Sequence, residues 1–159
     1  MRLRVLLLLA GLLVPAPAAA QAVGEVLEGP AEVIDGGSVR VGSQPLLLYG
    51  IAAIARHEPL GDASAGKLQQ IIAGRPLTCT VVDLRAGPGG PERDAVCKVA
   101  GRNGADIAAI MVDTGWAAVV KSRELRRIRP DVIETYGRLQ VDARSDCIGL
   151  WRALPECRS

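Results

Sequence analysis

The feature that most limits the fold is a set of three short apolar segments placed close together along residues 25–51. The segment AEVID is followed by the turn residues Gly36 and Gly37. The next segment, SVRVG, alternates so that Val39 and Val41 share one face, and a further short turn leads into LLLYGI. Strands this close in sequence predict an antiparallel meander.

A helix, a hairpin and two more helices are predicted after the meander. Residues 61–76 combine candidate capping residues with an apolar stripe and a Gly–Pro stop, which predicts a helix. The segments LTCTVVDL and AVCKVAG flank the Gly/Pro-rich loop RAGPGGPERD and predict the two arms of a hairpin. GADIAAIMVDTGW predicts a second helix, and Pro130 opens a third that extends to about Leu150. This order fits an α+β, mainly β fold: a five-stranded barrel of the OB type with about three helices.

The first 20 residues have the pattern of a cleaved secretory signal peptide. Arg2 and Arg4 form a charged n-region, an apolar run follows, and Ala18–Ala20 matches an A-x-A site, so cleavage is expected after Ala20. The apolar run is shorter than the roughly 20 residues of a membrane span. We therefore expect a single domain over residues 21–159, secreted or periplasmic, with no membrane span in the mature chain.

The charge balance weighs against a broad nucleic-acid-binding surface. The chain has 19 Lys and Arg and 17 Asp and Glu, and because Arg2 and Arg4 lie in the leader, the mature chain has no formal net charge. Nucleic-acid affinity depends mainly on Lys and Arg that neutralise phosphates. The four aromatic residues are too few for a base-stacking platform, and we expect both tryptophans to fill the core: Tyr49, Trp116, Tyr136 and Trp151.

Four cysteines in a chain expected to be exported predict two disulfides. A four-cysteine zinc site is the alternative, but the chain lacks any C-x-x-C pair. We favour Cys79–Cys97 and Cys147–Cys157 because each pair spans a short loop. Cys79 and Cys97 lie on the two arms of the predicted hairpin, where cross-strand neighbours approach closely enough to bridge.

Four motifs, in this order, resemble the thermonuclease (staphylococcal-nuclease-like) family. They are VIDGGSVRV, LLYGI, GADIAAIMVDTGWA and GLW, and the resemblance covers about residues 30–152. It implies an OB-type five-stranded barrel with three helices. Active members of that family hydrolyse DNA and RNA phosphodiesters with Ca²⁺.

The resemblance also implies that most catalytic side chains are replaced. In the usual first motif, V-I-D-G-D-T/S, both acids lie at the metal site. Here Asp35 matches the first acid, Gly37 replaces the second, and Ser38 matches the hydroxyl. Asp35 is then a remnant metal ligand or, as we favour, a turn former whose carboxylate accepts backbone N–H groups.

The usual second motif, R-L-Y-G-I-D-A/T-P-E, has lost its functional groups. Leu47 stands at the phosphate-binding arginine, Ala52 at the metal-binding aspartate, and Ala55 at the glutamate assigned as general base. The usual third motif, D-R-Y-G-R, carries a second phosphate-binding arginine, which Arg93 matches only with a gap.

These losses predict that the domain, which the signal peptide marks for export, serves as a non-catalytic binding or structural module. Ca²⁺ needs several oxygen ligands, and losing one charge-stabilising group typically costs about 10²–10³ in rate. We expect no cofactor, and Ca²⁺ only if nuclease activity survives. The sequence does not identify the partner, and a protein and a weakly bound nucleic acid are the two candidates.

Two alternative readings keep a function at specific residues. His57 and Glu58, with Asp35 and Arg93, would form a relocated site of a weak or altered metal-dependent phosphodiesterase; otherwise the first two are solvated loop residues. A basic segment would bind nucleic acid without cleavage, or is a solvated loop before the third helix: Lys121, Arg123, Arg126, Arg127 and Arg129.

Overall fold

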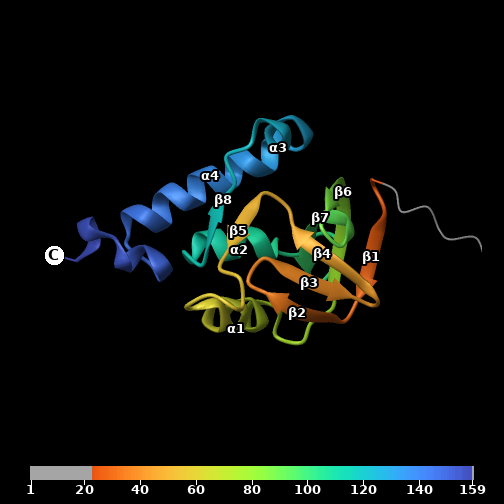
Figure 1. The fold of residues 1–159 in the computed structure, drawn as a ribbon, viewed down its shortest axis with the longest axis horizontal. Helices are drawn as coiled ribbons and strands as arrows, with labels where there is room; N and C mark the ends of the chain where they lie inside the picture. The colour runs from red at the N-terminus through yellow and green to blue at the C-terminus, as the bar shows by residue number, and fades with distance from the viewer. Residues whose placement is uncertain (1–22, 159) are drawn as a thin grey trace, which may run out of the picture.

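A computed structural model describes residues 23–158 of the protein. The predicted signal peptide and its cleavage site after Ala20 lie outside these residues. Within the described residues, strands and helices combine in one α+β arrangement (Figure 1). No helix in this part of the chain has both the length and the apolar character needed to span a bilayer.

The main layer is a curled six-stranded sheet that forms a half-barrel (Figure 1). The predicted meander is confirmed, because β2 pairs antiparallel with β3 and β3 with β4. The long β6–β7 hairpin joins this meander through a parallel pairing of β7 with β4. In sheet order the strands are β1 (Val26–Gly29), β6 (Leu77–Gly87), β7 (Gly90–Val99), β4 (Gln44–Leu48), β3 (Ser38–Val41) and β2 (Ala31–Asp35).

A sharp turn at Tyr49 and Gly50 divides the segment LLLYGI, which we had expected to be one strand. Gly50 has φ +76°, and a Cβ at this position would lie 2.5 Å from Ile133 Cδ1, so the turn requires glycine. Beyond it, β5 (Ile51–Ala53) pairs antiparallel with β8 (Ala117–Val119) in a small second sheet.

The described residues therefore contain eight strands, where five were expected. The additional strands are β1, β5 and β8, which are only three or four residues long. Segments this short carry little alternation of apolar and polar residues, so tertiary pairing rather than local pattern places them.

The described residues contain four α-helices, where about three were expected. Three of them correspond to predicted helices: α1 (Gly61–Ile72), α2 (Ile107–Asp113) and α4 (Pro130–Ser145). The fourth, α3 (Arg123–Ile128), occupies the basic segment that we had weighed as a loop. Its N-terminus is capped by Ser122, whose hydroxyl accepts the Glu124 N–H at 3.2 Å.

The core lies between the inner face of the half-barrel and helices α1, α2 and α4. Cys79 and Cys97 face each other across β6 and β7, and their side chains are fully buried. Both predicted cysteine pairs lie at disulfide distance, with S–S separations of 2.07 Å for Cys79–Cys97 and 1.92 Å for Cys147–Cys157. The second pair joins the region after α4 to the short 3-10 helices Gly149–Ala153 and Pro155–Cys157.

The two tryptophans differ from each other in their surroundings. Trp116 is partly buried and packs against the core. Trp151 lies outside the core cluster, and its ring is 5.8 Å from the guanidinium carbon of Arg144, which is cation–π distance. In the absence of phenylalanine, Tyr49 and Tyr136 are the largest fully buried side chains.

Candidate functional site

A cleft of about 240 Å³ lies where β2, β4, β5 and β7 approach one another, and we call it the Asp35 cleft. It contains three of the positions to which the sequence drew attention, together with a pair of charged residues from the β6–β7 hairpin. Its lining residues are Asp35, Gly37, Leu47, Leu48, Gly50, Ile51, Ala53, Arg85, Asp94, Val120 and Leu125.

Asp35 ends β2 and stabilises the turn into β3. Its Oδ1 accepts the N–H of Gly37 at 2.8 Å, which is the side-chain-to-backbone hydrogen bond expected of a turn-forming aspartate. A Cβ on Gly36 would lie 2.0 Å from the hydroxyl of Ser64 in α1, so this turn packs directly against a helix. The carboxylate of Asp35 therefore has a structural role even in the absence of a ligand.

Arg85 and Asp94 form the most organised charge pair of the cleft. The guanidinium binds the carboxylate through two contacts, Nε to Oδ2 at 2.7 Å and Nη2 to Oδ1 at 2.8 Å. Only 3% of the Asp94 side chain is exposed, compared with 49% for Arg85. Burial raises the pKa of Asp94 despite its pairing with Arg85, and the hydrogen bond to Asp94 raises the pKa of Arg85.

Sequence reasoning did not identify Arg85 or Asp94. They meet because β6 and β7 pair with an irregularity between Val81 and Asp83, which changes the register of the hairpin near its turn. No residue pattern in the Gly/Pro-rich loop indicates where such a bulge falls. The only available signal was the presence of oppositely charged residues on both arms of a predicted hairpin.

The positions with replaced side chains lie partly in the cleft and partly outside it. Gly37 and Leu47 line it, and neither provides a charged or polar side chain. Ala52 is exposed on β5 and Ala55 lies beyond the end of that strand, and neither lines the cleft.

The residues considered for a relocated site do not meet at the cleft. His57 and Glu58 lie in an exposed turn before α1. Arg93 is adjacent to Asp94 on β7, so its side chain points to the opposite face of the strand. There it is 4% exposed, with Nη1 3.9 Å from Glu25 Oε2. Of this group, only Asp35 lines the cleft.

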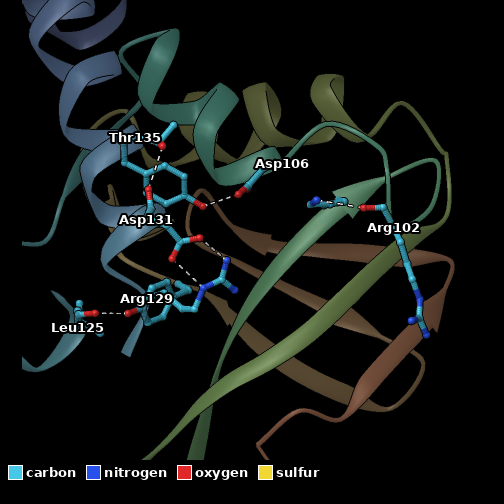
Figure 2. Close-up of polar contacts among 9 residues, drawn as sticks. Arg102, Asp106, Leu125, Arg129, Asp131 and Thr135 are labelled. Atoms are coloured by element: carbon cyan, nitrogen blue, oxygen red, sulfur yellow. Dashed lines mark hydrogen bonds and ion pairs between the residues drawn. The ribbon is translucent and has the colours of Figure 1, made fainter. Parts of the chain in front are cut away.

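The basic segment is divided between free and paired side chains. Arg129 binds Asp131 at the start of α4, with Nη2 2.7 Å from Oδ2 and Nε 3.0 Å from Oδ1 (Figure 2). This pairing raises the pKa of Arg129 and lowers that of Asp131. The other basic side chains are exposed and make no ion pair within residues 23–158: Lys121, Arg123, Arg126 and Arg127.

Helix α3 is fastened next to the cleft by a buried tyrosine. The Tyr49 hydroxyl donates to the backbone carbonyl of Leu125, and both residues are buried. Leu125 also lines the Asp35 cleft. The helix is thus positioned by the turn after β4, which connects the basic segment to the sheet.

Comparison with known proteins provides no further identification. No protein-family model matches the chain, and no curated protein matches its sequence.

Proposed function

We propose that this protein is an exported, OB-type barrel domain of the thermonuclease-like family that binds a ligand or partner and does not cleave phosphodiesters. The observation that carries the proposal is the composition of the Asp35 cleft. Its one unpaired acid, Asp35, already serves a turn, and its only cation, Arg85, is held by Asp94. The two disulfides are consistent with an oxidising compartment outside the cytoplasm.

The cleft residues do not fit a Ca²⁺ ion. Ca²⁺ takes six to eight oxygen ligands, with carboxylates supplying the negative charge. One oxygen of Asp35 accepts a backbone N–H, and both oxygens of Asp94 are bound by Arg85. Among residues 23–158 no group of three His, Cys, Asp or Glu side chains is arranged to hold a metal ion.

The cleft is also poorly suited to stabilise charge on a reacting phosphate. Phosphodiester cleavage needs positive groups aimed at the charge that develops in the transition state. Arg85 is the one basic residue that lines the cleft, and its charge is neutralised by Asp94. The side chains of Leu47, Ile51 and Ala53 are apolar and offer no charge to a phosphate.

A calcium titration tests this account without depending on activity. Isothermal titration calorimetry of the disulfide-intact mature protein is expected to show no saturable Ca²⁺ binding. Stoichiometric binding that is lost in Asp35→Asn and kept in Glu58→Gln would contradict the proposal.

One observation favours a second candidate, an altered metal-dependent phosphodiesterase. Asp35, Asp94 and Arg85 line the same cleft, so two carboxylates and a guanidinium are within reach of one ligand. In this case a bound phosphate would draw Arg85 away from Asp94, and the freed carboxylate would supply oxygen ligands for Ca²⁺ that the paired arrangement does not offer. This candidate predicts Ca²⁺-dependent cleavage of DNA that is lost in both Asp35→Asn and Asp94→Asn.

A further inference from the structure

A second and larger hollow lies along α4, away from the turn of Asp35. This groove has a volume of about 730 Å³, within the roughly 300–1,000 Å³ typical of small-molecule sites. It is formed by α4 together with the segment that leads from β8 into α3. The groove and the Asp35 cleft share only Val120, so an inference about the groove does not rest on the function proposed for the cleft.

The floor of the groove is apolar and partly open to solvent. Val119, Val120 and Ile133 form its inner part. Val141 lies farther along α4, and with 66% of its surface exposed it is the most exposed of the large apolar side chains in residues 23–158. Burial of this surface by a ligand would be favourable by the hydrophobic effect.

Gly137 deepens the groove at the middle of α4. Glycine is unfavourable inside a helix. The backbone at Gly137 does not require glycine, because its φ is not positive. Close packing does not require glycine either, because a Cβ at this position would meet no atom within 4 Å. The missing side chain therefore leaves open space in the wall of the groove.

The charges around the groove are unevenly distributed. Lys121 and Arg126 line it near α3, and neither makes an ion pair with a residue in the described part of the chain. Glu134 and Arg138 compensate each other at 3.2 Å. Asp142 lies on the last turns of α4, at the other end. The end near α3 is thus positive and the floor beyond it is apolar.

We propose that this groove binds a fatty acid, with its carboxylate on Lys121 and Arg126 and its acyl chain over Val119, Ile133 and Val141. A single anionic head matches the two free cations. An unbranched chain matches a floor that has no unpaired charge before Asp142. The wall opened at Gly137 gives the chain room to lie against α4.

Dodecanoate, below its critical micelle concentration, is the probe for the first experiment. Isothermal titration calorimetry at several temperatures is expected to show one saturable site with a negative heat-capacity change, the mark of apolar burial. Dodecyltrimethylammonium has the same chain with the opposite charge and is expected to bind at least tenfold more weakly. No saturable dodecanoate binding, or equal binding of the two amphiphiles, would overturn the proposal.

Two pairs of matched variants test the residues. The double variant Lys121→Ala/Arg126→Ala is expected to weaken dodecanoate binding about tenfold. The control, Arg123→Ala/Arg127→Ala, removes the same amount of charge outside the groove. It is expected to change dodecanoate affinity less than about twofold. An equal loss in both double variants would mean general charge attraction and would overturn the site.

Gly137→Leu is expected to fill the groove and abolish binding while the protein stays folded, because a side chain there meets open space. Gly66→Leu is its control, since Gly66 is exposed on α1 and is equally free of neighbours. Dodecanoate affinity retained in a folded Gly137→Leu protein would contradict the proposal. The proposal would also be contradicted if single-stranded DNA bound in a salt-sensitive manner, displaced dodecanoate and lost affinity in both charge variants.

Discussion

At the scale of single residues, the contact between Arg85 and Asp94 determines which charges the Asp35 cleft presents to a ligand. A carboxylate that is 97% buried would repel a phosphate, but its bidentate pairing with Arg85 neutralises it. The same pairing neutralises the charge of Arg85, the only basic side chain that lines the cleft. While this ion pair is intact, neither group is free to act on a ligand.

Removing Arg85 leaves the buried Asp94 carboxylate without a cation. We expect Arg85→Ala to lower the free energy of unfolding by about 1–3 kcal/mol, which is below the roughly 3–5 kcal/mol of a fully buried pair because half of Arg85 is solvated. Urea denaturation measures this change. Arg138→Ala removes a solvent-exposed partner of Glu134 and is expected to cost at most about 0.5 kcal/mol. Equal losses in the two variants would show that Asp94 is not buried as described.

At the scale of elements, α4 carries a glycine that its own stability does not require. Gly137→Ala is expected to raise the free energy of unfolding by up to about 1 kcal/mol, because the new methyl group meets open space. Gly115→Ala is the contrasting variant: φ is +71° there, and a Cβ would lie 2.3 Å from the carbonyl oxygen of Ile148. Thermal unfolding of both proteins checks this, and stabilisation of Gly115→Ala or destabilisation of Gly137→Ala would contradict it.

Helices α2 and α4 are joined by the partly buried carboxylate of Asp106, which gives a pH prediction (Figure 2). The hydroxyl of Tyr136 donates to Asp106 Oδ2 at 2.6 Å, and Asp106 Oδ1 accepts the N–H groups of Ala108 and Ala109 at the start of α2. Burial raises the pKa of Asp106 and that of Tyr136. The folded state therefore holds the Asp106 proton more tightly than the unfolded state does.

Because of this difference, the contribution of Asp106 to stability falls as pH rises from its unfolded pKa, about 3.9, through its higher folded pKa. Asp106→Asn keeps a capping side chain but cannot titrate. The free energy of unfolding of the native protein, relative to Asp106→Asn, is expected to decrease across this window and be constant above it. Urea denaturation at a series of pH values checks this, and a difference that increases with pH would refute it.

The elements that sequence predicted best were those whose pattern is local. The meander of residues 31–48, the hairpin around its Gly/Pro-rich loop and helix α1 all follow from alternation or from an apolar stripe with end signals. Strands β5 and β8 were missed because each is only three residues long and is defined by its partner. Helix α3 was missed because its six residues bury a single side chain, Leu125.

The candidate site was less predictable than the fold. Asp35 and Leu47 line one cleft because both lie opposite Ser38 of β3, Asp35 on β2 and Leu47 on β4. Arg85 and Asp94 depend on a bulge, and the groove along α4 depends on how a helix sits on a distant strand. Neither feature produces a periodic residue pattern or a characteristic residue spacing in the sequence.

At the scale of the whole molecule, the two disulfides stabilise different parts of the chain. Cys79–Cys97 crosses the centre of the half-barrel, whereas Cys147–Cys157 fastens the C-terminal region. Replacing either pair by serine is expected to cost about 3 kcal/mol from loop entropy. The loss is expected to be larger for Cys79 and Cys97, because two buried hydroxyls would replace apolar sulfur atoms. Denaturant unfolding of the two double variants measures the two losses in the free energy of unfolding. A larger loss for Cys147 and Cys157 would contradict the described core.

For the whole molecule, we propose an exported domain in which the Asp35 cleft serves structure and the binding surface lies elsewhere. The central claim is that the Asp35 cleft does not cleave phosphodiesters. The most direct measurement is cleavage of single-stranded DNA by the purified, disulfide-intact mature protein in Ca²⁺, beside a chelator control and the variants Asp35→Asn and Asp94→Asn. The account predicts no cleavage above the chelator control in any sample. Ca²⁺-dependent cleavage by the native protein that disappears in either variant would contradict it and establish the cleft as an altered active site.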